Sequence, residues 1–255
     1  MEILCGIIVT CTREMQGKAI RFAGLTRAAG AQPTGSSSSR SKCRRIFLLS
    51  PANASGQRAN LILGERGCSP LAIRLRSEGV PLGEIFSFIS GLYFRGKLAY
   101  ARTHADPPPG IPGVVVITAA GGLVSPDQAF TLEELREIAA GNVDAAEPRY
   151  RVPLERDARL LCDRMGDCEV VLLGSVATPK YVEPLLGIFG ERLMFPAEFV
   201  GRGDMSRGGL LLRYAREQAQ LTYVPVAGAV RHGARPPRLP KLARRVRQED
   251  DPRGS

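Results

Sequence analysis

Four glycine- and serine-rich segments, each directly after a short apolar run, carry the residues of this chain that could bind a ligand. They are 50–58 (SPANASGQR), 118–127 (TAAGGLVSPD), 174–180 (GSVATPK) and 198–209 (EFVGRGDMSRGG). Their composition is typical of loops whose backbone amides approach a small polar molecule. In open α/β sheets such ligands bind beyond the carboxyl ends of the strands. If the apolar runs are strands, these loops are where the sequence predicts a site.

The last segment has the most unusual composition, because two arginines and several glycines precede the apolar helical run LLLRYA. A glycine loop that leads into a helix N-terminus exposes unpaired backbone N–H groups and the positive end of the helix dipole, which favours phosphate or carboxylate. Arginine adds bidentate contacts to the same anion. The predicted ligand residues here are Arg202, Gly203, Arg207, Gly208 and Gly209. In the alternative interpretation the glycines form a tight turn and Asp204 caps the helix.

The first and third segments supply the remaining candidate ligand residues. Asn53, Ser55 and Arg58 follow the first apolar run, and Ser175 and Lys180 follow the third. The alternative is that these are ordinary loop residues and that Thr178-Pro179 starts a helix.

The chemistry itself is left open by the sequence. Neither a G-x-x-x-x-G-K-[ST] phosphate loop nor a G-x-G-x-x-G dinucleotide fingerprint is present. There is also no G-x-S-x-G elbow, and the two histidines fall in a helix and a tail, so serine hydrolase chemistry is unsupported. The catalytic residues are unknown. Asp127 and Asp204 are the best-placed candidates for an acid or base.

The net charge of +10 is concentrated at the two ends of the chain. Residues 1–45 carry +6, residues 231–255 carry +5, and residues 46–230 carry −1. A folded nucleic-acid platform usually has its excess positive charge on the domain itself. We therefore expect a domain at 46–230 between a basic, low-complexity leader (1–45) and a Pro/Arg-rich tail (231–255), both disordered.

Cysteine and histidine usage argues against a metal centre. The six cysteines form no C-x-x-C pair, and the chain has two histidines. We expect free thiols, no metal, no cofactor and a cytoplasmic location. Neither a signal peptide nor a transmembrane segment is predicted, so no membrane partner is expected. The oligomeric state stays open.

The hydrophobic pattern predicts alternating strands and helices. Strands are expected at 46–49, 114–117, 170–173 and 193–195, with an edge strand at 223–226. Helices are expected at 70–77, 82–89, 94–104, 132–140, 154–164, 181–189 and 206–218, with a capping box between Thr131 and Glu134. This alternation favours a single three-layer α/β domain with a mostly parallel sheet over a segregated α+β layout.

Residues 82–100 hold five of the fifteen aromatic residues and predict two packed helices around Gly91. The aromatic rings could stack on nucleic-acid bases. Because Arg95 and Lys97 are the two cations of this segment, we expect the rings to form core instead.

Four motifs in this order, SPANASGQR, GLVSPD, VVLLGS and GRGDMSRGGLLLR, carry a resemblance over residues 46–237. The segment resembles an uncharacterised bacterial family of hypothetical proteins. It is also similar to the uracil-glycosylase-like accessory domains of archaeal tRNA-guanine transglycosylases. Those domains usually have a Cys-Ser turn followed by Lys after the first strand, where this chain has Ser50-Pro51. The resemblance implies a nucleotide or nucleic-acid phosphate as ligand, and no catalytic residue carries over.

Two functional hypotheses follow. In the first, the chain has a binding or enzymatic pocket for a phosphate-bearing ligand, a nucleotide or a nucleic-acid end, at the carboxyl edge of the sheet. In the second, it is a non-catalytic nucleic-acid-binding or interaction protein whose basic tails supply the affinity.

Overall fold

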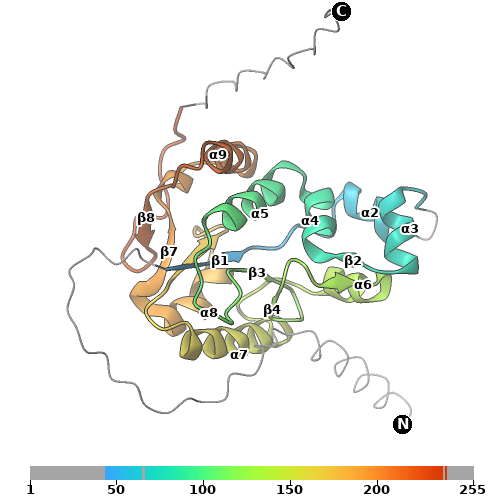
Figure 1. Ribbon diagram of the computed structural model, residues 1–255, viewed down its shortest axis with the longest axis horizontal. Helices are drawn as coiled ribbons and strands as arrows, with labels where there is room; N and C mark the ends of the chain where they lie inside the picture. Colours follow the sequence, from blue (N-terminus) through green and yellow to red (C-terminus); the bar gives the residue numbers. More distant parts are fainter. Residues whose placement is uncertain (1–43, 65–66, 238, 240–255) are drawn as a thin grey trace, which may run out of the picture.

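A six-stranded sheet with the order β4-β3-β1-β6-β7-β8 forms the centre of the protein (Figure 1). The computed structural model describes residues 44–64, 67–237 and 239. Four strands are parallel: β1 (Arg45–Leu49), β3 (Val114–Ile117), β6 (Glu169–Leu173) and β7 (Leu193–Pro196). The edge strands β4 (Leu123–Val124) and β8 (Tyr223–Pro225) are antiparallel to their neighbours. The predicted α/β fold with a mostly parallel sheet is confirmed.

Helices cover both faces of this sheet. They are α2 (Gln57–Leu63), α3 (Pro70–Ser77), α4 (Leu82–Ser90), α5 (Leu92–His104), α6 (Leu132–Ala140), α7 (Pro148–Arg164), α8 (Pro179–Phe189) and α9 (Asp204–Glu217). Single 3₁₀ turns, η1 (Gly190–Arg192) and η2 (Ala197–Phe199), flank β7. A short antiparallel pair, β2 (Val80–Pro81) with β5 (Ala129–Phe130), lies beside α4 and α6.

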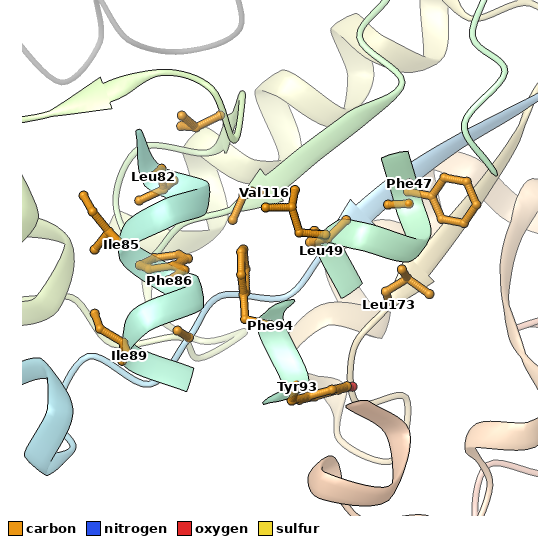
Figure 2. Close-up of a cluster of buried hydrophobic side chains, with 14 of the residues drawn as sticks. Phe47, Leu49, Leu82, Ile85, Phe86, Ile89, Tyr93, Phe94, Val116 and Leu173 are labelled. Atoms are coloured by element: carbon orange, nitrogen blue, oxygen red, sulfur yellow. The ribbon is translucent and has the colours of Figure 1, made fainter. Parts of the chain in front are cut away.

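The alternation of side chains along each strand divides the core into two layers. Phe47 and Leu49 of β1 point to the layer formed with α4, α5 and α9, whereas Ile46 and Leu48 point to the layer formed with α7 and α8. Figure 2 shows the first layer, in which Phe86, Phe94 and the aliphatic side chains of α4 and of the strands belong to one cluster. Phe86, Phe94 and Tyr100 are fully buried, which confirms the expectation that these rings form core. Each such side chain contributes about 1.5–3 kcal/mol of burial energy.

The chain leaves β1 and β6, which are neighbours, toward opposite faces. Residues after β1 lead to the helices of the α5 layer and then to β3, while residues after β6 lead to α8 on the other face and then to β7. The two loops therefore diverge at the carboxyl ends of adjacent strands. This is a topological switch point, the place where open α/β sheets leave a crevice for a ligand.

Helices α5 and α9 make the closest helix contact of this layer because glycine stands at the crossing. A Cβ atom on Gly96 would lie 2.7 Å from the carbonyl oxygen of Gly208, and one on Gly208 would lie 2.8 Å from Tyr93 Cα. These distances are shorter than any real Cβ contact, so both positions require glycine for the two backbones to meet.

Most predicted elements are present with limits that differ by a few residues. The Thr131–Glu134 capping box forms as expected. Helix α7 begins at Pro148 and continues through Pro153, earlier than the predicted start at 154. Helix α2 and the short strands β2, β4 and β5 were not predicted. The predicted tails lie mostly at 1–43 and 240–255, outside the described residues, and no helix in the described part of the chain is long and apolar enough to cross a membrane.

Candidate functional site

A cavity of about 690 Å³ lies at the switch point between β1 and β6. Each of the four predicted loops contributes to its lining: residues 50–58 throughout, Ala119 from the second, Ser175 and Lys180 from the third, and Asp204 from the fourth. The α4–α5 junction and residues 138–143 complete the wall. This volume falls in the range of about 300–1,000 Å³ that is typical of small-molecule sites. We call this cavity the Ser50 pocket.

Ser50 is the first residue after β1 and lies at the base of the pocket. Its backbone N–H donates to the carbonyl oxygen of Leu173, which extends the pairing of β1 with β6. Gly174, the residue after β6, leaves the space that the serine side chain occupies. A Cβ atom on Gly174 would lie 3.0 Å from Ser50 Cβ and 3.2 Å from its Oγ. The ends of these two strands therefore fix the position of the Ser50 hydroxyl.

Lys97, on α5, reaches Ser50 from inside the protein. Its Nζ donates to the Ser50 carbonyl oxygen at 2.5 Å and to Ser50 Oγ at 2.8 Å. The side chain is 1% exposed, and Nζ lies 4.5 Å from the ring centroid of Tyr93 and 5.0 Å from that of Phe94. No acidic side chain in the described residues forms an ion pair with it. Burial lowers the pKa of Lys97 to about 7, and the attraction of Asp204 opposes this shift.

Two tyrosines stand beside this pair and also line the pocket. The hydroxyl of Tyr93 is buried and has no hydrogen bond of normal geometry among the described residues, although the Arg207 guanidinium is close enough to interact with it. Burial raises the pKa of Tyr93 to about 12. Tyr181 is buried as well, and burial raises its pKa, while its hydrogen bond with Ser50 acts in the opposite direction. Both phenols therefore stay protonated at neutral pH and keep a proton to donate.

The predicted residues Asn53, Ser55, Arg58, Ser175, Lys180 and Asp204 all line the Ser50 pocket. The Asn53 side-chain oxygen accepts from the Ser55 N–H at 3.1 Å and from its hydroxyl at 2.7 Å, which holds the loop in a tight turn. Neither Arg58 nor Lys180 forms an ion pair within the part of the chain that the structure describes. Lys180 Nζ lies 5.1 Å from the ring centroid of Tyr181.

The other predicted ligand residues lie outside the lining. Arg202 donates to the Glu198 carbonyl oxygen at 3.0 Å and to Ser206 Oγ at 3.2 Å. Arg207 is 9% exposed and donates to the Phe199 carbonyl oxygen at 3.0 and 3.3 Å. Both guanidinium groups therefore hold the η2–α9 turn together.

The three predicted glycines of that turn and the two candidate aspartates, Asp127 and Asp204, differ in their contacts. Gly208 packs against α5, and Gly203 and Gly209 have no close neighbour within 3.4 Å of a Cβ position. Asp127 pairs with Arg102 on the surface. The alternative role of Asp204 as helix cap is wrong: the N-cap is Gly203, whose extended backbone starts α9, and Asp204 Oδ1 lies 3.7 Å from Arg207 Nη1 in the first turn.

The sequence interpretation missed Ser50, Lys97 and Tyr93 as site residues. One signal was present: Tyr93, Lys97 and Tyr100 recur at i, i+4 and i+7, which puts a lysine on the apolar face of a helix. A lysine at such a position is almost never fully buried unless it has a specific partner. That the partner is Ser50 follows from how α5 crosses the end of β1, which no local pattern reveals.

A second hollow, of about 390 Å³, lies between α7 and α8 and is lined by charged side chains that already pair with one another. Arg151 binds Glu155 and Glu183, and Arg159 binds Glu155. In the described residues no group of three or more His, Cys, Asp or Glu side chains is arranged to hold a metal ion. The Ser50 pocket is therefore the stronger candidate.

Comparisons with known proteins give this site no precedent. A scan against protein-family models, a search of curated proteins and a search of solved structures each found nothing similar to this chain.

Proposed function

We propose that this protein binds a small anionic ligand, a phosphate-bearing molecule such as a nucleotide, in the Ser50 pocket. One observation carries the proposal: the basic side chains around the pocket outnumber the acidic ones. Arg58 and Lys180 line it, and Lys97 lies directly beneath. Asp204 is the one carboxylate of the lining, and Arg207 already faces it. An anion would compensate the charges that the protein leaves unpaired.

The shape of the pocket suits a ligand with an apolar part as well. Ile89, Ile138, Ala139 and Tyr93 supply apolar side chains to its lining. A lining that combines cationic and apolar side chains suits a nucleotide or a similar amphipathic anion. A cytosolic location belongs to the same proposal and agrees with the free thiols of Cys162 and Cys168.

A thermal-shift screen of the full chain tests the proposal. The probes are inorganic phosphate, pyrophosphate, mononucleotides, nucleosides and short oligonucleotides. A probe at about 100 times its Kd stabilises the folded protein by about 2.7 kcal/mol, which raises Tm by several degrees. We expect a rise with phosphate-bearing probes and none with nucleosides.

Variants locate the binding. The double variant Arg58→Gln/Lys180→Gln should lose the shift, because it removes both cations of the lining. Arg202→Gln is the matched control, since this arginine lies outside the lining and should keep the shift. No shift with any probe, or a full shift in the double variant, would overturn the proposal. A shift with oligonucleotides alone that survives in the double variant would support the basic tails as the binding element.

A further inference from the structure

The contact between Ser50 and Lys97 has the form of a nucleophile with its base. Ser50 Oγ lies at the base of a ligand-sized pocket, and Lys97 Nζ is 2.8 Å away on the protein side of the hydroxyl. The Ser50 residue is 5% exposed and Lys97 is 1% exposed, so solvent reaches neither group freely. A lysine that is hydrogen-bonded to a serine and shielded from water is one of the arrangements that activate a serine hydroxyl.

We propose that Ser50 is a nucleophile and Lys97 its general base, and that together they cleave a carboxylic ester or amide whose anionic group is held by Arg58 and Lys180. The inference rests on the proposed function, because the anion site orients the acyl group toward Ser50. It also differs from the expectation drawn from the sequence, where the absence of a nearby histidine left serine chemistry unsupported. Lysine takes the place of histidine here.

The surroundings of Lys97 favour the neutral amine. Phe94 and Tyr93 of α5 cover the amine with their rings. Arg207 of α9 and Lys180 of α8 repel a positive charge, and Asp204 of α9 attracts it more strongly than either, but burial outweighs these effects. With a pKa of about 7, much of Lys97 is neutral at physiological pH and able to accept a proton.

The reaction balances without an additional reagent. The Ser50 oxygen attacks the acyl carbon as its proton passes to Lys97 Nζ. The tetrahedral intermediate collapses, the bond to the leaving group breaks, and Lys97 gives its proton to the departing alcohol or amine. Water then attacks the acyl-serine, with Lys97 as the base. The carboxylic acid leaves, and the Ser50 hydroxyl and the neutral lysine are regenerated.

Tyr93 is placed to stabilise the negative oxygen of the intermediate. Its hydroxyl is buried, lines the same pocket and has no partner of normal geometry in the described part of the chain. A buried donor without an acceptor is unfavourable, and such a group in a native structure suggests a role in which a ligand supplies the acceptor. A phenol that stays protonated at neutral pH can supply such an oxyanion contact.

A fluorophosphonate probe tests the pair directly on the full-length protein. Attack by an activated serine forms a Ser–O–P bond and releases fluoride, so intact mass gives the stoichiometry and peptide mapping gives the site. We expect one adduct, on Ser50, formed at a rate that rises with pH through about 7 as Lys97 loses its proton. Lys97→Met should slow labelling about 100-fold or more. Ser77→Ala, which changes an exposed serine on α3, should label normally.

A second readout uses 4-nitrophenyl succinate, an ester that carries a carboxylate. The wild-type protein should hydrolyse it, and Ser50→Ala should not. Thermal melts establish that each variant is folded. Labelling of folded wild-type protein that does not involve Ser50, or equal rates in Lys97→Met, would overturn the inference. Pyrophosphate binding that persists in Ser50→Ala would show that the proposed anion site stands even where the chemistry fails.

Discussion

Gly208 on α9 lies against the backbone of Tyr93 on α5, where a Cβ atom would come within 2.8 Å of Tyr93 Cα. Gly96, about one turn further along α5, meets Gly208 at the same crossing. This contact positions the segment of α5 that presents Tyr93 and Lys97 to the end of β1. The glycines that the sequence predicts as anion-binding residues therefore include one, Gly208, that lies at a helix crossing.

Gly208→Ala should destabilise the protein by about 1–3 kcal/mol, because the added methyl group forces the two helices apart. Gly209→Ala is the matched control. Its Cβ would find Leu239 Cδ1 at 3.9 Å, an ordinary contact, and alanine is the better helix former by about 1 kcal/mol. Urea unfolding of both variants measures the difference. Equal stability of the two would contradict the tight crossing of α5 and α9.

Replacing Lys97 with methionine should stabilise the protein at neutral pH. Burial penalises the protonated amine of Lys97, as its lowered pKa shows, and methionine is an apolar side chain of similar length that carries no such penalty.

The same substitution should change how stability depends on pH. An ordinary lysine has a pKa of 10.5, whereas burial lowers the pKa of Lys97 in the folded protein to about 7. Between these two pH values the unfolded chain therefore binds a proton that the folded protein has released. The free energy of unfolding of the wild-type protein therefore rises as pH increases from about 7 to 10.5. The gain is lost again as pH falls to the folded pKa of about 7.

Urea unfolding of both proteins at several pH values measures this effect. The advantage of Lys97→Met should be largest below about pH 7 and should shrink as pH rises from about 7 toward 10.5. An advantage that does not vary with pH would show that Lys97 titrates normally.

Two tyrosines of α5 should respond in opposite ways to loss of the hydroxyl. Tyr93→Phe removes a buried hydroxyl that has no hydrogen bond of normal geometry in the described residues and should leave stability equal or slightly higher. Tyr100→Phe leaves the Leu221 N–H, which donates to the Tyr100 hydroxyl at 2.9 Å, without an acceptor and also removes the contact with Tyr223. The expected loss is about 1–3 kcal/mol. Thermal melts of the two variants suffice, and a larger loss for Tyr93→Phe would show that its hydroxyl is already satisfied within the protein.

Local signals explain which elements could be predicted from the sequence. The runs VVVI and VVLL form the parallel strands, and Thr131 with Glu134 caps α6 because both partners of that motif are three residues apart. The helix predicted from the sequence begins at 154, directly after Pro153, a residue that normally interrupts a helix. The structure tolerates the proline within the helix.

The location of the candidate site could be predicted from the sequence, but the side chains at its centre could not. Strand ends point to the loops that line the pocket, because parallel strands bring their carboxyl ends to one edge. Six of the predicted residues line that pocket, yet the two arginines of the last loop bind backbone carbonyls instead. Lys97 lies 47 residues from Ser50. Their contact depends on the packing of α5 across β1, which spacing along the chain does not encode.

Amide-resonance mapping of the full chain during a titration with inorganic pyrophosphate tests the central claim most directly. The claim predicts shifts concentrated at Asn53–Arg58 and Ser175–Tyr181, around the Ser50 pocket. Shifts at Arg202, Gly203 and Gly209, or confined to residues 1–43 and 240–255, would contradict it and move the anion site elsewhere.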